Sequence, residues 1–313
     1  MTVAELTFKA MASAVQVILV DPAAGAQDYA RRRLEELERR WSRFVPASDI
    51  SRLNTSPEAL IMVSPDTILL LSTMMQAWRL TGRRYDPAML SAIVEAGYST
   101  SIDGSGRTSR MTGLPARGRS FTDVMIDPAT SAVMVPTGVG LDPGGIGKGL
   151  AADLVVIELL AGGTGGALVS VGGDLAAAGT APTPEGWLVA VEHPLDSSRE
   201  FMTLALEAGG IATSSTLTRT WSQNGDRRHH VIDPATGTCA TTDLAAVTVI
   251  ARAGWEAEAH ATAALLCGSE RALDYLDGHQ LAGIAMTLDG AVRMSPALER
   301  VGVTERSTAC TSA

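Results

Sequence analysis

The chain reads LDPGGIGKGLAAD from Leu141 to Asp153, a glycine-dense stretch that leads into an apolar helical pattern ending near Leu160. Glycines let a backbone turn approach a phosphate closely, because they lack a Cβ and accept positive φ angles. The helix predicted from Ile146 to Leu160 would add free N–H groups and a favourable dipole at its start, where Lys148 adds positive charge. The stretch therefore predicts either an anion-binding turn or a purely structural turn between a strand and a helix.

The glycine pattern does not match the two common nucleotide-binding signatures. A Walker A loop needs glycine at position 142 and serine or threonine after the lysine, but Asp142 and Gly149 occupy these positions. The dinucleotide fingerprint would start at Gly145 and would need glycine where Leu150 stands. The stretch is therefore neither a P-loop nor a Rossmann turn.

A second pattern follows toward the C-terminus, where the chain reads HHVIDPATG from His229 to Gly237. The small-residue segment Trp255–Cys267 is predicted to be a helix that carries Glu258 and Thr262 one turn apart. Oxygen atoms placed in this way can hold a hard cation such as Mg²⁺ against a phosphate. The alternative is an exposed carboxylate and a threonine that bonds back to its own helix. His230 has two interpretations as well, a phosphate contact or a turn cap.

Several short motifs, in the same order along the chain, resemble those of the ApbE family, the FAD:protein FMN transferases. The resemblance extends from about Phe8 to Gly268. The matched segments are Met11–Ser13, Ser42–Asn54, Arg83–Ala88, Leu141–Gly149, Val169–Asp174, Ala212–Ser214, His230–Gly237, Ala246–Ala251 and Ala257–Thr262. Because several motifs match, the resemblance favours a functional role for the glycine turn and for the Glu258–Thr262 pair.

The resemblance implies phosphoryl transfer at the diphosphate of FAD. A threonine hydroxyl of an acceptor flavoprotein would attack the FMN phosphorus, and AMP would leave. Mg²⁺, or alternatively Mn²⁺, would bridge phosphate oxygens and neutralise the developing charge. If water attacks instead, the protein is an FAD pyrophosphatase that produces FMN and AMP. If neither reaction occurs, it is a non-catalytic FAD-binding protein.

The resemblance also implies roles for individual side chains. Glu258 would be the main metal ligand, with Thr262 and the backbone carbonyl of Gly145 as the other protein ligands. Glu258, Lys148 and His230 would form the catalytic group, and the last two would face the diphosphate. The positions that match FAD contacts of the family are Met11, Phe44, Arg84, Tyr85, Asp86, Asp142, Lys148 and Ile232.

Some matched positions depart from the family pattern. Glu258 stands where the family has aspartate, which adds one methylene at a metal site with strict geometry. Gly147 replaces alanine and Ala88 replaces threonine, and these three substitutions favour the non-catalytic alternative. Phe44 replaces tyrosine, so an aromatic face is retained and one hydroxyl is lost.

The composition excludes several classes of protein. At 313 residues with 46% hydrophobic content, the chain can bury one large core or two modest cores. A net charge of −9 argues against a nucleic-acid partner, since a phosphate backbone requires clustered Lys and Arg. Cys239, Cys267 and Cys310 show no close pairing, which is typical of a reducing compartment. No segment resembles a signal peptide or a membrane span, so we expect a cytoplasmic protein without membrane insertion.

Interleaved helix and strand patterns predict an α+β fold of one domain over residues 1–313, with a core at 8–300 and a flexible tail at 301–313. The resemblance implies an ApbE-like unit of two interlocked halves, with mixed or antiparallel sheets flanked by helices. Strands are predicted at 8–20, 167–171, 187–192, 201–206 and 245–251. Helices are predicted after Asp21-Pro22, from Ser64-Pro65 to Gly82, at Ile146–Leu160, at Trp255–Cys267, and up to Leu276 after a Ser269 cap. Phe44–Asn54 is predicted to be a loop and 99–120 a surface excursion.

Overall fold

The computed structural model describes residues 1–112, 120–223, 225–300 and 302–304. Part of the predicted surface excursion, residues 113–119, lies outside these ranges, as do residues 301 and 305–313 of the predicted tail. Within that tail, β18 (Gly302–Thr304) is a short strand that pairs with β9 (Asp196–Leu206). This part of the predicted tail therefore belongs to a sheet.

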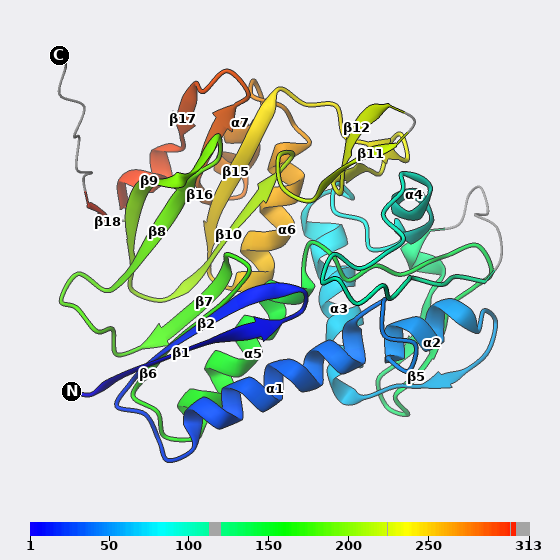
Figure 1. Cartoon of the computed structure of the whole chain (residues 1–313), viewed down its shortest axis with the longest axis horizontal. Coiled ribbons are helices and arrows are strands. Elements are labelled where there is room, and N and C mark those ends of the chain that lie inside the picture. Colours follow the sequence, from blue (N-terminus) through cyan, green and yellow to red (C-terminus); the bar gives the residue numbers. More distant parts are fainter. Residues whose placement is uncertain (113–119, 224, 301, 305–313) are drawn as a thin grey trace.

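Among the described residues, the largest sheet has eight antiparallel strands in the order β1-β2-β6-β7-β10-β15-β16-β17. Its strands are β1 (Val3–Ala10), β2 (Ser13–Val20), β6 (Gly166–Val171), β7 (Asp174–Gly179), β10 (Gly209–Ser215), β15 (Leu244–Ala251), β16 (Ala282–Thr287) and β17 (Val292–Met294). The two ends of the chain thus contribute to one sheet (Figure 1).

The central strands of this sheet are buried on both faces. One face packs against α5 (Gly147–Ala161), α6 (Gly254–Leu265) and α7 (Ala272–Gly278), and the other against β18, β9 and β8 (Trp187–His193). Along β15, Val247 and Val249 pack with α6 and α7, whereas Ile250 packs with Trp187 and Leu204. This alternation follows from the two-residue period of a strand, so β15 contributes side chains to two hydrophobic cores, one on each face of the sheet.

A second group of elements packs beside α5 and completes the fold (Figure 1). Its helices are α1 (Ala26–Trp41), α2 (Asp49–Thr55), α3 (Pro65–Leu80) and α4 (Leu90–Glu95), with a 3₁₀ turn at Phe121–Asp123. Its sheet pairs β3 (Ile61–Met62), β5 (Ala132–Met134) and β4 (Met125–Asp127). The hairpins β11 (Thr220–Gln223)–β12 (Asp226–His229) and β13 (Ile232–Asp233)–β14 (Thr238–Cys239) follow β10, and a 3₁₀ turn at Pro296–Arg300 precedes β18. The predicted α+β class is therefore confirmed.

The predicted helix start at Ser64-Pro65 is confirmed. The Ser64 hydroxyl accepts a hydrogen bond from Thr67 N at 3.2 Å, and Pro65 is the first residue of α3. The helix ends at Leu80, two residues before Gly82, whose φ is +60°. No helix within the described ranges is both long and apolar enough to cross a lipid bilayer.

The prediction of a single strand at 8–20 is wrong. β1 and β2 form a hairpin that turns at Met11 and Ala12, whose φ angles are 52° and 54°. Two consecutive positive φ angles are the geometry of a two-residue hairpin turn, which usually selects Asn and Gly. Because neither residue type is present here, the sequence contains no local signal for this turn.

The prediction of a loop at Phe44–Asn54 is also wrong in its second half. α2 begins there, and the Ser48 hydroxyl caps it by accepting a hydrogen bond from Ser51 N at 3.0 Å. Ser48 directly before Asp49 is a local N-cap signal for this helix.

Two other helix starts lie later than predicted. The helix expected after Asp21-Pro22 begins at Ala26. Ser269 does not cap α7, which begins at Ala272, because its hydroxyl donates to the Asp243 carboxylate instead, as does its backbone N–H at 2.9 Å. A tertiary partner outcompetes the local capping role.

Candidate functional site

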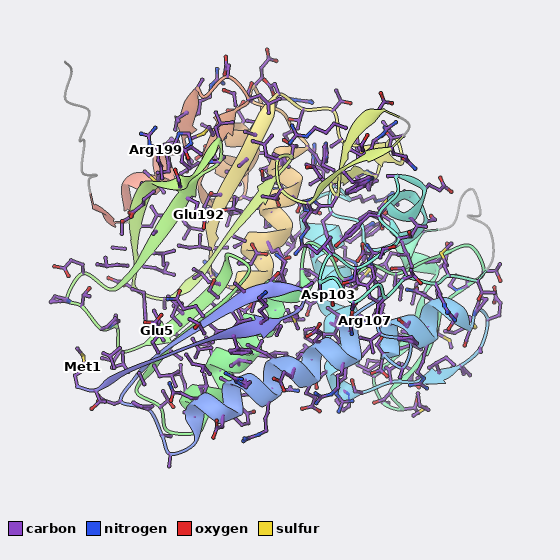
Figure 2. All side chains as sticks on the ribbon, viewed as in Figure 1. Met1, Glu5, Asp103, Arg107, Glu192 and Arg199 are labelled. Atoms are coloured by element: carbon purple, nitrogen blue, oxygen red, sulfur yellow. The ribbon has the colours of Figure 1, made fainter. Side chains whose placement is uncertain are left out.

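A cleft of about 1290 Å³ is lined by the tip of the β1–β2 hairpin, the starts of α5 and β7, part of α6, and β8. Figure 2 labels Glu192 on β8 and the Asp103–Arg107 ion pair near the hairpin tip, and all three side chains line this cleft. Sites for drug-sized ligands usually have smaller volumes, so this cleft has room for a dinucleotide.

All residues predicted for the site line this single cleft. They are Met11, Phe44, Arg84, Tyr85, Asp86, Asp142, Gly145, Lys148, His230, Ile232, Glu258 and Thr262. These residues come from widely separated parts of the chain, so only the tertiary fold brings them together.

The glycine turn before α5 is shaped by close contacts. Gly145 has a φ of +82°, and a Cβ there would lie 3.2 Å from the Tyr85 ring and 3.6 Å from Thr262 Oγ1. Its backbone therefore lies directly beside Thr262. The Tyr85 hydroxyl is buried without a hydrogen-bond partner among the described residues. Burial, followed by the charge of Glu258, raises the pKa of Tyr85, so its hydroxyl stays protonated and can donate to a ligand.

α5 and α6 begin side by side and cap each other. A Cβ on Gly149 would lie 2.3 Å from the carbonyl oxygen of Gly254, so only glycine permits this approach. Asp153 on α5 accepts hydrogen bonds from Gly254 N at 2.8 Å and Trp255 N at 2.9 Å. Glu258 on α6 accepts one from Gly149 N at 2.8 Å. Each carboxylate thus complements the positive end of the opposite helix, although burial raises the pKa of Asp153 to about 6.

The start of α5 is less open to an anion than the sequence predicted. Gly147 N donates to the Pro143 carbonyl at 2.9 Å, and Gly149 N donates to Glu258. Two N–H groups of the first turn therefore already have acceptors within the protein.

Lys148 is paired with two buried carboxylates. Its Nζ contacts the Asp174 carboxylate and lies 3.4 Å from Glu258 Oε1. The side chains of Asp174 and Glu258 are only 3% and 4% exposed, and Asp174 Oδ1 also accepts from Thr213 N at 3.3 Å. Burial lowers the pKa of Lys148, and the charge of Glu258 opposes this shift. Lys148 thus joins β7 to α6 electrostatically.

His230 presents a buried ring nitrogen to the cleft. Its Nδ1 has no hydrogen-bond partner among the described residues. Burial, together with the charges of Arg219 and Lys148, lowers the pKa of His230 to about 3, so the ring is neutral at pH 7. We refer to Lys148, Asp174, Arg219, His230 and Glu258 as the charged end of the cleft.

The sequence model of the ApbE family matches residues 5–287. The chain belongs to the ApbE family. It is 32% identical over 166 residues to the FAD:protein FMN transferase of Escherichia coli strain K12, covering 52% of this chain and 47% of that protein. The chain thus spans about half the length of this relative. It is 28% identical over 263 residues to the FAD:protein FMN transferase of Vibrio cholerae O395, covering 80% of this chain and 75% of the relative.

Solved ApbE structures share the fold. The ApbE protein from Thermotoga maritima has a TM-score of 0.82 at 22% identity, covering 96% of this chain and 99% of that chain. The flavin transferase ApbE from Vibrio cholerae has a TM-score of 0.77 at 20% identity, with the same coverage. The interlocked arrangement described above is therefore the ApbE fold.

The ApbE motif around Phe44 contributes to the other end of the cleft. The guanidinium of Arg43 lies 4.2 Å from the Phe44 ring centroid and 4.7 Å from that of Tyr98. Tyr98 stacks on Trp221 with 5.4 Å between centroids, and Arg43 Nε lies 3.4 Å from Asp142 Oδ1. We refer to Arg43, Phe44, Tyr98 and Trp221 as the aromatic end. Arg43, Phe44 and Tyr98 line the cleft and offer flat surfaces to a ring system, whereas Trp221 stacks on Tyr98 without lining the cleft.

Several site residues were missed from the sequence. Arg43 lies within an ApbE motif beside Phe44, which was an available signal. Tyr98, Arg219 and Trp221 lie outside the matched motifs, so only the fold places them here. Asp174 ends the matched segment Val169–Asp174, and the structure pairs it with Lys148.

The far side of α6 carries a separate cluster of rings. His260 Nδ1 lies 2.7 Å from the Tyr275 hydroxyl, and the ring of His279 lies 4.8 Å from that of His260. The guanidinium of Arg84 lies 5.5 Å from the Tyr275 ring centroid, so Arg84 lies between this cluster and the cleft. The Nδ1 of His260 is thus occupied by its hydrogen bond with Tyr275.

Proposed function

We propose that this protein transfers the FMN moiety of FAD to a threonine hydroxyl of an acceptor flavoprotein, with release of AMP and with Mg²⁺ or Mn²⁺ as cofactor. Membership of the ApbE family and the names of its relatives support this proposal. The observation that carries it is the convergence of the Gly145 turn, Lys148, His230 and the Glu258–Thr262 pair on one cleft. Because Met11 and Thr262 line the same cleft, we also propose that the chain acts as one domain.

The side chains present are compatible with a hard cation. Glu258 Oε1 faces Lys148 at 3.4 Å, Thr262 Oγ1 lies 2.9 Å from Ser214 Oγ, and Gly145 lies beside Thr262. Carboxylate, hydroxyl and carbonyl oxygens are the ligands that Mg²⁺ prefers, and it usually adds phosphate oxygens and water. Glu258, Thr262 and the Gly145 carbonyl would therefore hold it. When bound, Mg²⁺ would neutralise charge on the diphosphate oxygens.

The proposed reaction exchanges one phosphorus–oxygen bond for another. The acceptor hydroxyl oxygen attacks the FMN phosphorus, the bond to the bridging oxygen breaks, and AMP leaves with that oxygen. In this proposal, Glu258 accepts the hydroxyl proton, and the neutral Nδ1 of His230 binds near the reacting phosphate. The tight α5–α6 contact at Gly149 keeps Glu258 in place, so the protein contributes mainly positioning.

The compartment follows from the chemistry of the cysteines. Among the described residues, Cys239 and Cys267 are both free thiols. Free thiols are typical of reducing compartments, so we propose that the reaction takes place in the cytoplasm.

The test is a reaction with FAD, Mg²⁺ and an acceptor domain that carries a threonine flavinylation site. Intact mass spectrometry should detect addition of one FMN moiety through a phosphoester, and chromatography should detect one AMP per modified acceptor. The same acceptor with Thr→Val is the matched control and should stay unmodified. AMP and free FMN without a modified acceptor would indicate an FAD pyrophosphatase instead. Tight FAD binding without AMP release would indicate a non-catalytic binding protein.

A further inference from the structure

Lys148 has little charge to offer a ligand, because two buried carboxylates already surround it. Its Nζ contacts Asp174 and lies within 3.4 Å of Glu258, and both carboxylates are almost fully buried. If Lys148 turned toward a phosphate, it would leave Asp174 without a partner in a poorly solvated site, even where a metal ion neutralised Glu258. Removing one partner of a buried ion pair is strongly unfavourable. Beside the metal ion, the diphosphate therefore needs a cationic side chain other than Lys148.

Arg219 differs from Lys148 because no carboxylate of the described residues pairs with it. It lines the cleft from the segment between β10 and β11. The only hydrogen bond of its guanidinium to the described residues is a long one, from Nη2 to Ser13 Oγ at 3.5 Å. Arg219 also has a φ of +48°, an unfavourable backbone conformation for a side-chain-bearing residue. Such strain is commonly found at ligand sites.

The surroundings of Arg219 suit an anion. Ser13 lies on the turn of the β1–β2 hairpin, and a Cβ on Gly172 would lie 2.7 Å from Ser13 Oγ and 3.8 Å from Lys148 Cδ. Glycine at 172 therefore lets the β6–β7 turn approach Ser13 and Lys148 closely. His230, whose buried Nδ1 has no hydrogen-bond partner among the described residues, also lines the cleft, and burial followed by the charge of Arg219 lowers the pKa of His230.

We propose that Arg219 supplies the charge-assisted hydrogen bonds to the diphosphate of FAD, whereas Lys148 is a positioning residue that holds Asp174 and Glu258. This inference rests on the proposed function and goes beyond it, because it assigns the phosphate contact to a residue outside the matched motifs. An arginine suits the role, since its planar guanidinium can donate two parallel hydrogen bonds to phosphate oxygens.

The test compares the affinities of five proteins for FAD and for riboflavin, which lacks the diphosphate, by flavin fluorescence titration with and without Mg²⁺. Arg219→Gln should weaken FAD binding about 10- to 100-fold, as expected for lost hydrogen bonds to a charged group, and leave riboflavin binding unchanged. Arg219→Lys should recover part of the loss, because it restores the charge without the bidentate geometry. Arg227→Gln removes an exposed arginine that does not line the cleft and lies on β12, in the hairpin that follows Arg219, and this variant should bind like the wild type.

Lys148→Gln supplies the other half of the test. It should lower the thermal stability and keep the preference for FAD over riboflavin. The inference is overturned if Arg219→Gln keeps the wild-type preference for FAD, or if Lys148→Gln abolishes it without loss of stability. In either case, AMP release by the wild type would leave the proposed function intact. A wild type that binds FAD and riboflavin equally well would instead overturn the proposed function and this inference together.

Discussion

The two ends of the cleft are built in different ways. The carboxylates and the lysine of the charged end are held by regular elements, since Asp174 begins β7, Lys148 lies in the first turn of α5 and Glu258 lies on α6. Its other two residues, Arg219 and His230, lie in segments between strands. The aromatic end is held by segments between elements, because Arg43, Phe44 and Tyr98 lie outside the helices and strands and Trp221 lies on a short hairpin. We infer that the charged end is rigid and serves the reaction, whereas the aromatic end adapts and serves affinity.

The reciprocal caps explain why the charged end is rigid. Glu258 and Asp153 each bond to backbone N–H groups of the opposite helix, and Gly149 lets the two helix starts touch. A change at this end therefore affects both charge and packing. Stacked rings at the aromatic end tolerate small shifts, because each contact is weaker and less directional. The following predictions test this difference, from the largest expected effect to the smallest.

Glu258→Gln should reduce AMP release by about 1000-fold, because it removes the negative charge while keeping the shape. Raising Mg²⁺ or Mn²⁺ should recover part of the activity if metal affinity is what falls. Steady-state assays of AMP release at several metal concentrations provide the measurement. Glu256→Gln is the matched control on the same helix, since Glu256 does not line the cleft. Unchanged metal-dependent turnover in Glu258→Gln would remove Glu258 from the catalytic group.

Glu258→Asp restores the residue that is usual in the family and makes the test more specific. In this chain the longer side chain reaches Gly149 N at 2.8 Å, so the backbone is adapted to glutamate. We expect the shorter side chain to lose this hydrogen bond. The turnover number should then fall about tenfold. Higher activity in Glu258→Asp would contradict that adaptation.

Lys148→Met should lower the free energy of unfolding by about 3 kcal/mol, because Asp174 and Glu258 would stay buried without a cation. Urea denaturation monitored by tryptophan fluorescence would measure the loss. The double variant Lys148→Met/Asp174→Asn should recover part of it, since one uncompensated charge is removed. Equal stability of the single variant and the wild type would mean that the ion pairs contribute nothing.

Asp153 should make the charged end sensitive to pH. Burial raises the pKa of Asp153 to about 6, above its ordinary value of 3.8, so the folded protein binds this proton more tightly than the unfolded chain. The stabilising contribution of the protonated form is fully present below pH 3.8 and is lost as the pH rises through 6. We expect the free energy of unfolding to fall by about 3 kcal/mol over this pH range because of Asp153.

Asp153→Asn tests this expectation, because its side chain does not titrate. Stability measured by denaturation from pH 3.5 to 7 should fall less steeply than in the wild type. Asp28→Asn, an exposed change on α1, should leave the wild-type slope unaltered. If stability falls equally steeply with pH in Asp153→Asn and in the wild type, another group is responsible for the pH dependence.

Phe44→Leu should weaken FAD binding only about five- to tenfold and leave the maximal turnover nearly unchanged, because it removes the ring contacts with Arg43 and Tyr98. Phe44→Tyr keeps the ring and should bind FAD like the wild type. A kcat effect in Phe44→Leu as large as that of Glu258→Gln would erase the proposed difference between the two ends.

Local signals predicted much of the fold. Ser64 and Pro65 marked the start of α3, the glycine stretch marked the start of α5, and the apolar run near Val247 marked β15. The β1–β2 turn was missed, because Met11 and Ala12 are not turn residues. Capping by Ser269 was wrong, because Asp243 binds that serine from a distant part of the sequence.

The sequence by itself determined three candidate residues of the charged end, Lys148, His230 and Glu258, and their order in the ApbE motifs, because turn chemistry and helical spacing act over a few residues. Only the tertiary structure decided how these residues are paired. Lys148 meets Asp174 and Glu258, and Arg219 stays without a carboxylate partner among the described residues, because β7, α5 and α6 pack together from distant parts of the chain. Such pairings depend on which elements pack together, and no local pattern encodes that.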